Sequence, residues 1–111
     1  MGRVEEKRRA KRLPTLWEIT FSDGKRSFTD FIRDMSTGGV QVESPVPFEA
    51  GTHLVLSMSP PQLKLRGIVR WCRKDGLKYA TGIKFLFEND EQERTIREMM
   101  QSMFWDHAKA R

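Results

Sequence analysis

Cationic side chains are concentrated in the first twelve residues, a distribution that suits the binding of a compact polyanion. This segment carries six Lys and Arg residues against two Glu residues, and the remainder is nearly neutral within a net charge of +5. A long nucleic-acid duplex would instead call for a basic face spread across the fold. Arg8 and Arg12 have the spacing Arg-x-x-x-Arg, which is weak evidence by itself because Arg66 and Arg70 share it.

A second group of polar residues runs from Asp34 to Gly39, with the sequence DMSTGG, between two segments that alternate as strands do. Asp and Ser side chains in such a turn commonly accept hydrogen bonds from nearby backbone N–H groups. We expect Gly38 and Gly39 to supply positive φ angles there. Taken alone, the segment is interpreted as a structural turn.

The elements that must position these residues are predicted to be strands. Alternating apolar residues indicate six of them, over about 16–21, 26–33, 40–43, 53–58, 63–71 and 79–87. Asp-Gly pairs at 23–24 and 75–76 predict tight hairpins. Closely spaced strands joined in this way favour a mainly β fold, a six-stranded antiparallel barrel.

The last segment changes to a helical period. Its apolar residues recur three or four positions apart, at Ile96, Met99, Met100, Met103 and Phe104. Asp90 is predicted to cap this helix, with Glu93 completing a capping box. We expect the helix to plug or flank one opening of the barrel.

Length and composition predict one domain of residues 13–111 preceded by a flexible basic arm, residues 1–12, whose cations repel one another and bury nothing. No apolar run approaches the roughly 20 residues that a membrane span needs. The N-terminus has no apolar signal region, so a cytoplasmic protein is expected. The single cysteine, Cys72, excludes an intrachain disulfide and is interpreted as a strand residue.

The order of the motifs resembles that of the PilZ domain family. The Arg-x-x-x-Arg motif stands just before the first predicted strand, and an Asp-x-Ser-x-x-Gly motif joins the second strand to the third. Residues 67–71 (GIVRW) and 82–85 (GIKF) look like the family's strands around its last hairpin. The resemblance covers roughly residues 6–104. It implies a six-stranded barrel that receives the bacterial second messenger cyclic di-GMP.

The resemblance implies roles for the arginines of the arm. Arg8 and Arg12 would be the principal stacking and hydrogen-bonding residues. Arginine suits this ligand because its planar fork pairs with phosphate or with guanine O6 and N7, and its face stacks on a base. Arg9 would reach a phosphate or a second nucleotide, with a solvated charge as the alternative.

The family pattern also assigns the turn to the ligand. Asp34 would accept hydrogen bonds from the guanine N1–H and amino groups, and Ser36 would bond to base or phosphate. Gly38 and Gly39 would let the backbone approach the ligand closely.

Trp71 has two interpretations. Its parity with Leu65 and Val69 on an alternating strand indicates a core residue. If the strand instead opens toward the arm, the indole could stack on a base. Trp71 is therefore kept as a candidate ligand-binding residue.

The expected protein is a receptor that binds cyclic di-GMP, orders its arm and signals to an unidentified effector protein. An enzyme is not expected, because no metal-binding or Walker pattern occurs, nor the Gly-Gly-Asp-Glu-Phe and Glu-Ala-Leu signatures of cyclic di-GMP enzymes. No cofactor and no metal are expected. The alternatives are a PilZ-like interaction module that does not bind nucleotide and a small barrel that binds single-stranded nucleic acid. The near-neutral body argues against DNA or RNA.

Overall fold

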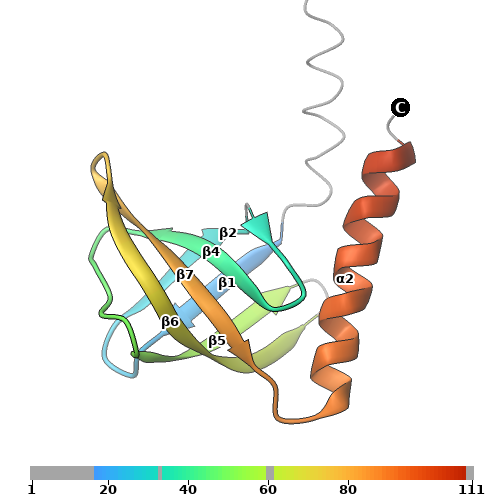
Figure 1. Ribbon diagram of the computed structural model, residues 1–111, viewed down its shortest axis with the longest axis horizontal. Coiled ribbons are helices and arrows are strands. Elements are labelled where there is room, and N and C mark those ends of the chain that lie inside the picture. The colour runs from blue at the N-terminus through green and yellow to red at the C-terminus, as the bar shows by residue number, and fades with distance from the viewer. Residues whose placement is uncertain (1–16, 33, 60–61, 110–111) are drawn as a thin grey trace, which may run out of the picture.

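The computed structural model describes residues 17–32, 34–59 and 62–109. The described chain forms one antiparallel sheet in the strand order β2-β1-β5-β6-β7-β4-β3 and one helix. The sheet curls into a half-barrel with the helix beside it (Figure 1). The elements are β1 (Glu18–Ser22), β2 (Ser27–Phe31), β3 (Asp34–Met35), β4 (Gly39–Ser44), β5 (His53–Ser59), β6 (Leu63–Asp75), β7 (Lys78–Leu86) and α2 (Asp90–Lys109).

The mainly β class with a C-terminal helix is confirmed, with one more strand than the six predicted from alternation. The additional strand, β3, has only two residues, too few to show a period. Asp34 and Met35 lie opposite Gln41 and Val40 of β4. The Asp-x-Ser-x-x-Gly motif therefore begins inside the sheet rather than in a free loop.

Alternation along the strands fills the interior of the half-barrel. Ile19 and Phe21 of β1 are fully buried, as is Leu56 of β5 opposite Phe21. Trp17, just before β1, is buried in the same core. The curl also brings β2 toward β4, where the backbone N–H of Glu43 donates to Asp30 Oδ2 at 3.0 Å.

The long β6–β7 hairpin contains an irregularity that changes the face of one strand. Val69 lies opposite Ile83, but Trp71 lies opposite Gly82, so Arg70 is an extra residue at a β-bulge. A bulge adds one residue and reverses the parity of the later residues in its strand. The interpretation of Trp71 as a core residue is therefore wrong, and its side chain is 37% exposed.

The helix α2 is capped one residue earlier than predicted. Asn89 Oδ1 accepts the backbone N–H of Gln92 at 2.9 Å, and Gln92 Oε1 accepts the backbone N–H of Glu88 at 2.7 Å. These two hydrogen bonds cap the helix in place of the predicted Asp90 and Glu93. They differ from a standard capping box, because Gln92 accepts the N–H of Glu88 and not that of the cap residue Asn89. Asp90 and Glu93 lie in the first turn of the helix, where their negative charges interact favourably with the positive end of the helix dipole.

The helix α2 packs against the sheet through the apolar face of the helix. Ile96 and Met99 are buried in the core, and Met100 packs against it. The side chain of Gln92 also donates to the carbonyl of Lys64 on β6 at 3.1 Å. Within the described residues, no helix combines the length and apolar character of a membrane span.

The β1–β2 turn depends on Asp23. Its Oδ1 accepts the backbone N–H groups of Arg26 at 2.8 Å and Lys25 at 2.9 Å, while Gly24 takes a φ of 96°. Hydrogen bonds from the backbone of Arg26 and then of Lys25 lower the pKa of Asp23 below its ordinary 3.8. The charged carboxylate is thus the form that stabilises the turn.

An Asp23→Ala variant is expected to melt at a lower temperature than the wild type at neutral pH. A depressed folded-state pKa gives stability that is complete above the ordinary value of 3.8 and is lost as the pH falls through the folded-state pKa. Melting curves should therefore converge in acid. Asp23→Asn keeps an acceptor without the charge, so its melting temperature at neutral pH should lie between those of the wild type and Asp23→Ala. A difference in melting temperature between wild type and Asp23→Ala that grew in acid would contradict this role of the charged carboxylate.

Candidate functional site

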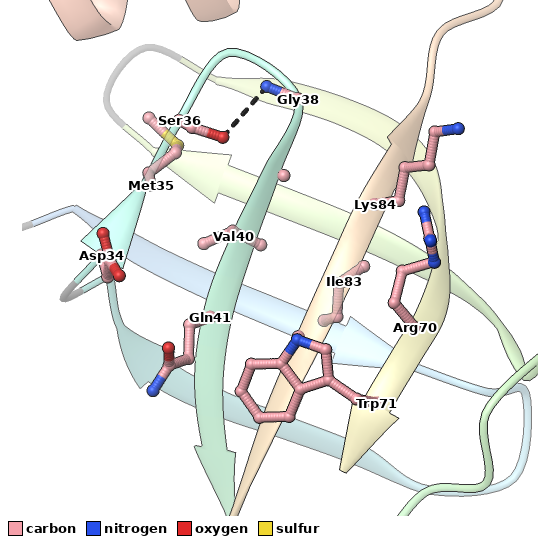
Figure 2. A pocket seen from close by; sticks show the side chains of 12 residues that line it. Asp34, Met35, Ser36, Gly38, Val40, Gln41, Arg70, Trp71, Ile83 and Lys84 are labelled. Carbon is pink, nitrogen blue, oxygen red and sulfur yellow. Dashed lines mark hydrogen bonds between the residues drawn. The ribbon is translucent and has the colours of Figure 1, made fainter.

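An open pocket of about 440 Å³ lies where β3, β4, β6 and β7 adjoin (Figure 2). This volume falls within the roughly 300–1,000 Å³ that is usual for small-molecule sites. The pocket brings together five of the eight residues predicted for the site: Asp34, Ser36, Gly38, Gly39 and Trp71. The other three, Arg8, Arg9 and Arg12, lie outside the described residues.

The turn from Ser36 to Gly39 is held in place from both sides. The backbone N–H of Ser36 donates to the carbonyl of Gly39 at 2.9 Å, and Ser36 Oγ accepts the N–H of Gly38 at 3.2 Å. The Gly38 carbonyl accepts the N–H of Phe85 on β7 at 2.9 Å. Because β7 is a central strand, the turn is fixed to the body of the sheet.

Neither glycine of this turn has a positive φ, which corrects the expectation from sequence, and Gly39 is needed for space instead. The described glycines with positive φ are Gly24, Gly51 and Gly76. At Gly39, a Cβ atom would overlap the backbone carbonyl oxygen of Ile83 on β7, a neighbour that cannot rotate away. A Cβ at Gly38 would meet nothing within 4 Å.

These two adjacent glycines make a matched test of the turn. Gly39→Ala is expected to lower the free energy of unfolding by about 1–3 kcal/mol, the usual cost of overpacking. Gly38→Ala should lower it by much less, since its Cβ enters open space. Urea unfolding of the two variants measures the difference, and equal stabilities would contradict the close approach of β4 to β7.

Trp71 lies flat across the strand next to its own. A Cβ at Gly82 would overlap the indole Nε1 and Cε2 atoms, so the ring rests directly on the Gly82 backbone. The guanidinium carbon of Arg73 lies 4.8 Å from the centre of the indole. Gly82 thus creates the room in which an aromatic ring lies against the sheet at the edge of the pocket (Figure 2).

Charge is separated across the pocket. The carboxylate of Asp34 projects from β3 on one side, whereas Arg70 and Lys84 lie on the other side, on β6 and β7 (Figure 2). The side chains of all three residues are exposed to solvent. Among the described residues, none donates a hydrogen bond to the Asp34 carboxylate.

Arg70, Lys84 and Gln41 also line the pocket and were not predicted from the sequence. Arg70 was seen only as an accidental repeat of the Arg-x-x-x-Arg spacing. Lys84 carried a usable signal, because it is two residues after Gly82 in the GIKF strand and so shares its outward face. Gln41 is two residues after Gly39 on β4 and could have been placed by the same alternation.

The described chain is thus a small antiparallel β domain, a curled half-barrel with an open pocket beside its Asp-x-Ser-x-x-Gly turn. The chain belongs to the PilZ domain family, whose model matches residues 6–102. Domains of this family are typically receptors for cyclic di-GMP and are generally non-catalytic. No curated protein matches the sequence significantly.

Solved structures share the fold at low sequence identity. The complex of K. pneumoniae MrkH with c-di-GMP superposes with a TM-score of 0.73 at 15% identity, covering 86% of this chain and 49% of that one. The Bacillus subtilis inhibitor of motility, MotI/DgrA, gives a TM-score of 0.66 at 14% identity, with 80% of this chain and 47% of that one covered. The chain thus spans about half the length of these proteins.

Proposed function

We propose that this PilZ domain binds cyclic di-GMP in the pocket beside the Ser36–Gly39 turn. The observation that carries the proposal is the separation of charge in that pocket, with Asp34 on one side and Arg70 and Lys84 on the other. Cyclic di-GMP has the matching pattern, because its guanines present hydrogen-bond donors and its two phosphates are anionic. The fold shared with the MrkH–c-di-GMP complex supports the same ligand class.

The Asp34 side of the pocket suits guanine. A carboxylate accepts hydrogen bonds only, and guanine offers it two adjacent donors, N1–H and the exocyclic amino group. Adenine has an unprotonated N1 at the equivalent position, so its ring would face the carboxylate with an acceptor. Ser36 Oγ already accepts the N–H of Gly38, which leaves its O–H free to donate to base or phosphate.

The opposite side of the pocket suits the phosphates. Arg70 and Lys84 are exposed cations that can donate charge-assisted hydrogen bonds to phosphate oxygens. The indole of Trp71, resting on Gly82 and partly exposed, supplies an aromatic face on which a guanine can stack. Base recognition and charge neutralisation are thereby assigned to different walls of one pocket.

The basic arm completes the proposed site. Arg8 and Arg12 would stack on and hydrogen-bond to the nucleotide, and Arg9 would reach a phosphate or a second nucleotide. Binding a dianion relieves the repulsion among the arm's cations and clamps the arm against the turn. The ordered arm would then be read by an effector protein in the cytoplasm, without catalysis by this domain.

Hydrogen exchange of the full chain, with and without cyclic di-GMP, tests this proposal. We expect the amides of residues 1–12 and of Ser36–Gly39 to exchange more slowly with the ligand, because the clamp shields them from water. Cyclic di-AMP at the same concentration serves as the control and should change neither segment. Equal protection of the arm in the free and cyclic di-GMP-bound states would contradict the clamp.

A further inference from the structure

The tip of the β6–β7 hairpin extends past the neighbouring strands. Pairing of β5 with β6 ends at Ile68, and pairing of β4 with β7 ends at Tyr79. The last pair of the hairpin, Asp75 opposite Lys78, therefore joins only its own two strands within the described sheet. In Figure 1 the tip lies at the end of the sheet remote from α2.

The hairpin tip, residues 73–78, combines one fully exposed aliphatic side chain with several cations. Leu77 is 96% exposed, well above Phe31 at 46%, the next most exposed large apolar residue among those whose burial the structure describes. The cations beside it, all exposed, are Arg73, Lys74 and Lys78, against the single carboxylate of Asp75. Packing within the described part of the fold does not explain this leucine, because its side chain is almost fully exposed there and Gly76 already supplies the turn's φ of 66°.

We propose that this hairpin tip docks on an anionic membrane surface, with Leu77 entering the lipid interface and Lys74 and Lys78 contacting headgroup phosphates. Interfacial binding of this kind draws on a buried apolar side chain together with attraction between basic residues and anionic lipid. The projecting shape matters, because it lets Leu77 reach a flat surface before the rest of the domain does.

A lipid surface fits the hairpin tip better than an acidic protein does. A stable protein interface buries about 800 Å² on each partner, usually around a cluster of apolar and aromatic side chains. The tip offers one leucine surrounded by charges, and the nearest exposed aromatic residue, Trp71, lies over Gly82 at the pocket. A membrane surface does not need so large an area, because one inserted side chain and a few cations beside it both add to weak, reversible attachment.

Docking by the tip leaves the ligand pocket accessible. Arg70 and Trp71 line the pocket and precede the tip along β6. The docking residues proposed here, Lys74, Leu77 and Lys78, lie beyond Arg73, the residue of the tip whose guanidinium lies over the Trp71 ring. Membrane docking by the tip therefore does not depend on nucleotide binding in the pocket, and each property can be tested and rejected separately.

The test is co-sedimentation of the full chain with vesicles of phosphatidylglycerol and phosphatidylcholine in equal parts, and with vesicles of phosphatidylcholine alone. We expect binding to the mixed vesicles that falls as salt is raised, and little binding to the neutral ones. Lys74→Glu with Lys78→Glu should weaken binding at least twentyfold, from roughly fivefold for each lost cation. Leu77→Thr should weaken it by roughly tenfold through loss of the inserted leucine.

Matched variants elsewhere on the surface serve as controls. Lys25→Glu with Lys64→Glu changes the net charge equally on exposed positions away from the tip, and Val55→Thr removes an exposed aliphatic side chain from β5. All variants keep the basic arm. If the arm alone attracted the protein to the membrane, the Lys74/Lys78 and Lys25/Lys64 double variants would bind the mixed vesicles equally well. That result would overturn the proposal.

Two further outcomes would also overturn the membrane proposal. One is the absence of sedimentation of the wild type with either kind of vesicle, which would leave an acidic protein surface as the occupant of the tip. The other is equal binding to neutral vesicles. Calorimetric titration of the same variants with cyclic di-GMP should give unchanged affinity, since none of the substituted residues lines the pocket.

Discussion

An Asp34→Ala variant is expected to fold as the wild type does and to bind cyclic di-GMP at least a hundredfold more weakly. Asp34 is exposed, so its removal leaves no buried group without a partner. The expected loss corresponds to two charge-assisted hydrogen bonds to guanine, each about 1.5–3 kcal/mol. Every 1.4 kcal/mol changes the affinity about tenfold.

The measurement is calorimetric affinity combined with melting temperature. Asp90→Ala is the control, because it removes another exposed carboxylate, from the first turn of α2 and outside the pocket lining. Asp34→Asn should also bind weakly, since an amide offers one acceptor where the carboxylate offers two. Unchanged affinity in Asp34→Ala would contradict the placement of guanine beside this residue.

Replacement of Arg8 and Arg12 together by alanine is expected to reduce the affinity for cyclic di-GMP about a thousandfold or more. Each side chain is proposed to stack on a base, at about 1–3 kcal/mol, and to donate hydrogen bonds to the ligand as well. Equilibrium binding at a fixed ionic strength measures the loss, because part of it is electrostatic.

The arm itself supplies the control for this experiment. Lys7 and Lys11 have the same four-residue spacing as the two arginines and the same total charge. Alanine at both lysines should weaken binding only severalfold, because a lysine offers attraction to phosphate without a planar face or a paired fork. Equal losses from the two double variants would show that the arm acts through its charge alone.

Alternation and turn signals predicted the fold because each strand buries one face. The hairpins at Asp23-Gly24 and Asp75-Gly76, and the burial of Ile96 and Met99, follow from short-range patterns and are confirmed. The two-residue strand β3 was missed, because its existence depends on β4 lying next to it and not on its own residues.

The errors at the site have a common cause, which is that they depend on neighbours distant in sequence. Trp71 faces outward because Arg70 is an extra residue at a bulge, which parity along one strand does not reveal. Gly39 is required by the carbonyl of Ile83 on another strand. The error at the helix cap is of a different, local kind, because Asn89 and Gln92 offer a second pair of capping side chains directly beside Asp90 and Glu93.

The most direct test of the central claim is calorimetric titration of cyclic di-GMP into the full wild-type chain, with cyclic di-AMP and GTP as controls. The account predicts saturable heat with cyclic di-GMP, far weaker binding of the other two nucleotides, and a stoichiometry of one or two ligands per chain. Absence of binding heat from a chain that melts cooperatively would contradict it, and would indicate a PilZ domain that serves as an interaction module without nucleotide.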